Sequence, residues 1–151
     1  MHMLTNRAQV QMGQWVLVIG GASGVGSAAI QIAKQFGAYV IATGSSPAKR
    51  DLALSLGAQA AVDSTREDWP LEVRQLTQKR GVDLVVEHVG GPVLEKVFTC
   101  LARGGTVVTC GATAGRHPHT SNWGATLPWA TFTAAKISAL VSGDRSLSIQ
   151  T

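Results

Sequence analysis

Charged residues are scarce in this sequence: they make up 15% of its 151 residues, whereas hydrophobic residues make up 45%. Soluble domains carry on average about 25% charged residues, so we expect part of the surface to be covered by another domain or a partner. The net charge is +4, but the 13 basic residues are scattered and form no run typical of nucleic-acid-binding arms. The sequence therefore disfavours nucleic acid as a partner.

Cysteine is nearly absent, and Cys100 and Cys110 have no histidine or cysteine at metal-ligand spacing. We interpret both as core thiols, and His117 and His119 as solvated loop residues, and predict that this chain binds no zinc. With neither a secretory leader nor a disulfide-like framework, the sequence favours a reducing compartment, and we predict a cytoplasmic location. No apolar stretch approaches the roughly 20 residues of a membrane helix, so no membrane association is predicted.

Short apolar runs alternate with stretches of helical periodicity. Ser46 and Pro47 are typical of a helix start, and Gly37 is typical of a helix end. The alternation predicts a single Rossmann-type α/β domain of three layers, with a doubly wound parallel sheet that binds ligands at the carboxyl ends of its strands. A helix is predicted in each interval between the strands, which are predicted at 15–19, 39–43, 58–62, 82–87 and 106–110.

A glycine-rich turn, residues 20–26, separates the first strand from the first helix. From Gly21 onward it fits the dinucleotide fingerprint G-x-G-x-x-G, except that Ser23 replaces the middle glycine. Unpaired backbone N–H groups and the positive end of the helix dipole hold a pyrophosphate at such a place, and Gly24 and Gly26 permit its close approach. The same glycines also suit a tight turn that binds nothing, but the position between strand and helix favours a dinucleotide site.

No acidic residue stands at the end of the second strand, where NAD-binding domains hold the ribose hydroxyl with a carboxylate. Gly44 occupies that position, and Ser45, Ser46, Lys49 and Arg50 follow it. The missing carboxylate removes a repulsion against a 2′-phosphate, and the serines and basic residues offer donors to it, so NADP(H) is favoured over NAD(H). Alternatively, Lys49 and Arg50 belong to a solvated helix face. The missing carboxylate also disfavours an adenosylmethionine-dependent methyltransferase.

Residues 16–38, VLVIGGASGVGSAAIQIAKQFGA, strongly resemble the medium-chain dehydrogenase/reductase superfamily. The zinc-type alcohol dehydrogenase and quinone oxidoreductase branches look most similar. Segments 56–58, 81–91 and 101–113 are similar as well, so the resemblance covers about residues 2–115.

The resemblance implies which residues contact the cofactor. Ser23, Gly24 and Val25 would hold the pyrophosphate, and Ser45 with Lys49 the adenosine phosphate. A tyrosine that often supports the adenosine end in quinone oxidoreductases is replaced by serine at position 64. The nicotinamide side would be lined by Val89, Gly90, Gly111 and Ala112.

In this superfamily a separate barrel-like domain, most of which precedes the nucleotide-binding domain, holds the substrate and any catalytic zinc. We therefore interpret residues 1–14 as a lead-in from such a domain and residues 15–115 as the NAD(P)-binding domain. The whole protein would be a homo-oligomeric oxidoreductase acting on a small molecule, and this piece would be inactive alone. Residues 116–151 depart from the pattern, which leaves open a sixth strand at 137–141 or an end that does not fold natively.

No catalytic residue is assigned. For His88, after the fourth strand, a structural role is favoured over a proton relay. Tyr39 has no lysine four residues on, which disfavours the short-chain dehydrogenases. The alternative function is a regulatory module that senses a nucleotide without catalysis, because a fold does not determine a function. A barrel domain encoded upstream would favour the enzyme.

Overall fold

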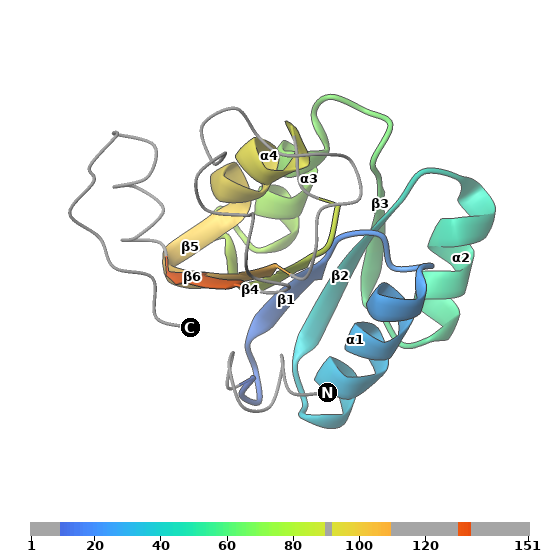
Figure 1. The fold of residues 1–151 in the computed structure, drawn as a ribbon, viewed down its shortest axis with the longest axis horizontal. Helices are drawn as coiled ribbons and strands as arrows, with labels where there is room; N and C mark the ends of the chain where they lie inside the picture. The colour runs from blue at the N-terminus through green and yellow to red at the C-terminus, as the bar shows by residue number, and fades with distance from the viewer. Residues whose placement is uncertain (1–9, 90–91, 110–129, 134–151) are drawn as a thin grey trace.

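The structure, a computed structural model, describes residues 10–89, 92–109 and 130–133 (Figure 1). Strands and helices alternate from the first strand to the fifth, as the sequence predicts. The elements are β1 (Trp15–Val18), α1 (Gly24–Gln35), β2 (Tyr39–Gly44), α2 (Pro47–Ser55), β3 (Ala60–Asp63), α3 (Trp69–Leu76), β4 (Val82–Glu87), α4 (Pro92–Cys100), β5 (Leu101–Thr109) and β6 (Ala130–Thr133).

The strands form one sheet in the order β3-β2-β1-β4-β5-β6. Strands β1 to β5 pair in parallel, and β6 is added antiparallel to β5 at the edge. From β1, the chain adds β2 and β3 on one side of the sheet and then β4, β5 and β6 on the other. Open α/β sheets bind ligands at such a reversal, beyond the carboxyl ends of the strands. The predicted Rossmann-type fold class is confirmed.

Helices cover both faces of the sheet, α1 and α2 on one face and α3 and α4 on the other (Figure 1). Alternate residues of β1 serve the two faces: Val16 and Val18 pack in the core that contains Ile30 of α1, whereas Leu17 packs in the core that contains Val73 of α3. All five side chains are fully buried. A strand buried on both faces needs apolar residues throughout, which is why these strands appear in the sequence as continuous apolar runs.

Side-chain caps begin the first two helices at the carboxyl edge of the sheet. Ser23 is the N-cap of α1, and its hydroxyl accepts a hydrogen bond from Gly26 N at 3.0 Å. Ser46 caps α2 and accepts from Lys49 N at 3.2 Å, with Pro47 as the first helical residue. The start predicted for α2 is confirmed.

Two strands begin elsewhere than the sequence predicts. β3 begins at Ala60 rather than at residue 58, because Ala58 N donates to Ala53 O and so belongs to the end of α2. β5 begins at Leu101 rather than at residue 106, because Leu101 pairs with Val82 before a shift of register. The end of the preceding helix thus decides the first boundary, and pairing with β4 decides the second.

The strand β6 falls in a threonine-rich segment where the sequence predicts no strand. Its register on β5 pairs Thr106 with Thr133 and Thr109 with Ala130. The strand predicted at 137–141 and the second cysteine, Cys110, lie outside the described residues. An edge strand is defined by backbone hydrogen bonds to its neighbour, which a pattern of side chains does not specify.

Cys100, the last residue of α4, is fully buried, with its sulfur 3.4 Å from Lys96 O. Burial raises the pKa of its thiol to about 11. Its interpretation as a core thiol is confirmed. Within the described residues, no helix combines the length and the apolar character that crossing a membrane requires.

Candidate functional site

The turn from β1 to α1 is attached to β2 by hydrogen bonds from its backbone N–H groups to Thr43. Gly20 N donates to Thr43 Oγ1 and Gly21 N donates to Thr43 O, each at 3.0 Å. Gly20 adopts a φ of +67°, and a Cβ atom on Gly26 would overlap the carbonyl group of Gly20. Glycine is therefore required at both positions for the helix to start this close to the strand end.

Ser23 connects this turn to the end of β4. Its hydroxyl donates to Gly20 O at 2.8 Å and accepts from Gly26 N, and His88 Nε2 lies 3.0 Å from the same oxygen. The hydroxyl group of Ser23 thus contacts Gly20, Gly26 and His88 at once, and the tautomer of His88 sets the direction of its hydrogen bond with the imidazole. His88 thus holds the turn in place, which supports the structural role favoured by the sequence.

The two basic residues at the start of α2 have different partners. Lys49 Nζ lies 3.0 Å from Ser45 Oγ, and both residues are exposed. Arg50 Nη1 donates to Gly44 O at 3.1 Å and lies 3.4 Å from Asp63 Oδ1. Arg50 therefore ties the ends of β2 and β3 together, whereas the ammonium group of Lys49 is held at the surface beside a hydroxyl.

Asp63 ends β3 and pairs in the sheet with Gly44, the residue that leaves the end of β2 without an acid. Hydrogen bonds from the side chain and backbone of Thr65 lower the pKa of Asp63, and Arg50 lowers it further by a smaller electrostatic effect. This carboxylate is thus anchored to the protein by Thr65 and Arg50.

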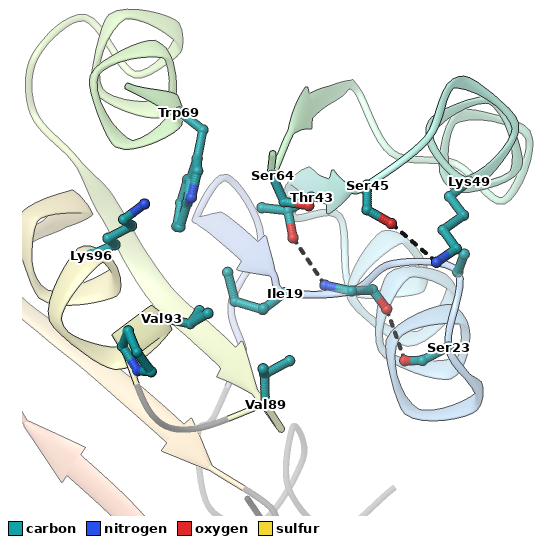
Figure 2. A pocket seen from close by; sticks show the side chains of 14 residues that line it. Ile19, Ser23, Thr43, Ser45, Lys49, Ser64, Trp69, Val89, Val93 and Lys96 are labelled. Atoms are coloured by element: carbon teal, nitrogen blue, oxygen red, sulfur yellow. Dashed lines mark hydrogen bonds between the residues drawn. The ribbon is translucent and has the colours of Figure 1, made fainter. Parts of the chain in front are cut away.

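A cleft of about 410 Å³ opens at the carboxyl edge of the sheet (Figure 2). It lies where the strand order reverses, between the glycine-rich turn and α2 on one side and α3 and α4 on the other. Its lining is formed by Ile19, Gly20, Ala22, Ser23, Thr43, Gly44, Ser45, Lys49, Ser64, Trp69, Val89, Pro92, Val93 and Lys96.

The cleft brings together five of the residues that the sequence assigns to a cofactor: Ser23, Gly44, Ser45, Lys49 and Val89. The sequence places Val89 on the nicotinamide side, but in the structure it lines the same cleft as Lys49.

Other predicted residues lie beside the cleft rather than in its lining. Gly21 is packed so closely that a Cβ atom there would come within 2.8 Å of Ala42 Cβ. Gly24 and Val25 are exposed residues of the first turn of α1, and Gly26 is a buried residue of the same turn. Three predicted residues lie outside the described part of the chain: Gly90, Gly111 and Ala112.

Sequence reasoning assigned no role to the half of the cleft formed by α3 and α4. Trp69 at the start of α3 and Val93 and Lys96 of α4 line this half. Their spacing resembles that of any amphipathic helix, so no local signal distinguishes them. Thr43, the residue just before Gly44, was also missed, although its place at a strand end was a usable signal.

No group of three or more His, Cys, Asp or Glu side chains within residues 10–89, 92–109 and 130–133 is placed to hold a metal ion. The chemistry available at the cleft is instead that of helix N-termini, hydroxyl groups and the ammonium groups of Lys49 and Lys96 against apolar walls. Such an arrangement suits an anionic ligand with an apolar part.

Comparison with known proteins agrees with this arrangement. The family model of zinc-binding dehydrogenases matches residues 24–146. The chain belongs to this family. The match reaches beyond residue 115, where the resemblance in the sequence was taken to end.

Individual members of the family match with substantial identity. The quinone oxidoreductase-like protein 2 homolog of Nematostella vectensis is 35% identical over 116 residues, which are 76% of this chain and 32% of that protein. The chain thus spans about a third of the length of this curated relative.

Solved structures agree in fold. An NAD-dependent alcohol dehydrogenase superposes with a TM-score of 0.71 at 45% identity, covering 76% of this chain and 33% of that one. A mycobacterial protein solved in complex with NADPH superposes with a TM-score of 0.73 at 34% identity, covering 78% and 36%. The structural match lies in the nucleotide-binding part of the superfamily.

The described residues do not fit the zinc for which the family is named. A catalytic zinc takes about three protein ligands, and the described part of the chain offers no such set. A dinucleotide does fit the described residues. The turn requires glycine at residues 20 and 26, and it presents the N-terminus of α1 to the cleft. The described residues of the site therefore fit a nucleotide and offer no ligand set for a metal.

Proposed function

We propose that this chain is the cofactor-binding part of an NADP(H)-dependent oxidoreductase of the alcohol dehydrogenase or quinone oxidoreductase type. The observation that carries the proposal is the cleft. A glycine-rich helix start lies on it, and a serine–lysine pair lies beside the strand end where NAD-binding domains have an acid. The relatives include one named NAD-dependent and one solved with NADPH, so the choice between the two cofactors depends on this chain's own residues.

The pyrophosphate would lie at the N-terminus of α1. This helix has 12 residues, and no acidic side chain lies in its first turn. Its free N–H groups and dipole favour an anion, and the small residues Ser23 and Gly24 allow the phosphates to approach the backbone. The contacts of Ser23 with Gly20 and His88 would hold the turn in this geometry before the ligand binds.

The 2′-phosphate of NADP(H) would lie between Ser45 and Lys49, whose polar atoms are 3.0 Å apart. Gly44 contributes no carboxylate to repel it, and Arg50 shields the charge of Asp63 from this end of the cleft. An ammonium group and a hydroxyl that already lie together form charge-assisted hydrogen bonds to phosphate at little cost in side-chain ordering.

The bound nicotinamide would supply hydride transfer, and the protein would orient it. Val89 would line its approach, together with Gly90, Gly111 and Ala112, which lie outside the described residues. The substrate would be held by another part of the enzyme, so the chain by itself would bind the cofactor and catalyse little. Catalytic zinc, where the whole enzyme uses it, would be bound outside this chain.

Titration with NADPH and NADH, followed by nicotinamide fluorescence, tests the proposal. We expect NADPH to bind more tightly, and Lys49→Gln to weaken NADPH about tenfold while changing NADH by less than twofold, because the lost bond is a charge-assisted one to phosphate. The matched control is Lys34→Gln, which removes an exposed lysine at the far end of α1. Tighter binding of NADH by the unaltered chain would overturn the NADP(H) preference, and binding of neither would overturn the proposal.

A further inference from the structure

The side chain of Trp69 is the largest one in the half of the cleft to which no role is yet given. It is the first residue of α3 and only 2% exposed, and its indole ring is directed from the helix start into the cleft (Figure 2). Among the described residues, no acceptor lies within hydrogen-bonding distance of its Nε1–H. A buried donor without an acceptor is uncommon and unfavourable, so this group calls for a partner that enters with a ligand.

The surroundings of Trp69 restrict what that ligand is. Ile19, Pro92 and Val93 supply apolar walls to the same cleft. The ammonium group of Lys96 at the rim is engaged by Glu67 at 2.9 Å, so the pair contributes no net charge there. This part of the cleft thus combines apolar walls, a buried N–H donor and an ion pair without net charge at the rim. Such surroundings suit an uncharged, flat ring that carries hydrogen-bond acceptors.

Adenine has this chemistry. It is flat and uncharged, and its ring nitrogens N1, N3 and N7 accept hydrogen bonds. The phosphate-binding end proposed above, at Ser45 and Lys49, lines the same continuous cleft as Trp69. The volume of about 410 Å³ is within the range of small-ligand sites.

We propose that Trp69 recognises the adenine base of the bound dinucleotide by donating its Nε1–H to a ring nitrogen. This inference rests on the proposed function, because it concerns the same ligand. Trp69 would thus be a specificity-determining residue for the base, as Lys49 is for the phosphate. No step of hydride transfer involves it.

The test compares dinucleotide binding by the unaltered chain and by Trp69→Phe, with NADPH and with adenosine 2′-monophosphate as probes. We expect both ligands to bind about fivefold more weakly to the variant, the effect of one neutral hydrogen bond. Trp15→Phe is the matched control: Trp15 begins β1 at the opposite end of the strand, where its ring lies 5.1 Å from that of Tyr39. We expect it to leave both affinities unchanged.

Because Trp69→Phe also removes volume from the core, a second variant keeps the ring and removes only the donor. Replacing Trp69 by benzothienylalanine, in which sulfur stands for the indole N–H, should give the same fivefold loss with an unchanged unfolding temperature. Unaltered affinity in this variant overturns the inference and leaves the proposed function standing. If the unaltered chain binds neither NADPH nor NADH, the proposed function is overturned, and the inference with it.

Discussion

Replacing Ser23 by alanine removes three hydrogen bonds from the turn between β1 and α1. They join Ser23 Oγ to Gly26 N at 3.0 Å, to Gly20 O at 2.8 Å and to His88 Nε2 at 3.0 Å. An N-cap contributes about 1 kcal/mol, and each further partly buried hydrogen bond about 0.5 to 1 kcal/mol. We therefore expect the free energy of unfolding of Ser23→Ala to fall by about 2 to 3 kcal/mol.

The control is Ser46→Ala, which removes the N-cap of the next helix. Ser46 accepts from Lys49 N at 3.2 Å, and within the described part of the chain its hydroxyl has no further partner. We expect this variant to lose about 1 kcal/mol. Urea unfolding followed by circular dichroism gives both values from the midpoint and slope of the transition. Equal losses in the two variants would refute the reasoning, because the contacts with Gly20 and His88 would then contribute nothing.

Three further predictions concern other parts of the domain. Gly26→Ala should destabilise the chain by about 3 kcal/mol or more in urea unfolding, because its Cβ would overlap the carbonyl of Gly20; Gly24→Ala, with open space around it, should change stability little. Cys100, whose pKa burial raises to about 11, should resist alkylation at pH 8 until the chain unfolds, as peptide mass spectrometry would show. Since the folded pKa of Asp63 is lowered, its stabilising effect is full above the unfolded pKa near 4 and is lost as the pH falls through the folded pKa. The amount by which Asp63→Asn lowers the unfolding temperature should therefore be full at pH 7 and shrink as the pH falls below about 4.

The strands near the centre of the sheet were predictable from local sequence. β4 occupies Val82–Glu87 as predicted, and β1 and β2 differ from prediction by one residue at one end. Strands buried on both faces must be apolar throughout, so their signal is continuous and does not depend on knowing the neighbours. The boundaries of β3 and β5 were less predictable, because a helix end and a register shift decide them.

Half of the candidate site was predictable for a similar reason. Ser23, Gly44, Ser45 and Lys49 lie in two strand-to-helix connections, where glycine, serine and lysine are recognisable at fixed distances from a strand end. The other half was not. Trp69 and Lys96 are ordinary helix residues in the sequence. Only their place beside the cleft, where the strand order reverses, gives them access to a ligand.

The sequence by itself determined the Rossmann-type fold, the glycine-rich turn and the absence of an acid at the end of β2, because each depends on residues adjacent along the chain. Only the tertiary structure decided what holds the turn and what completes the cleft. Ser23 and His88 are 65 residues apart in sequence, and their contact exists because β4 lies beside β1 in the sheet. The crossing of the chain from β3 to β4 likewise carries α3 to the opposite face and brings Trp69 to the cleft. Strand order is set by the packing of the whole core, and no local pattern of residues specifies it.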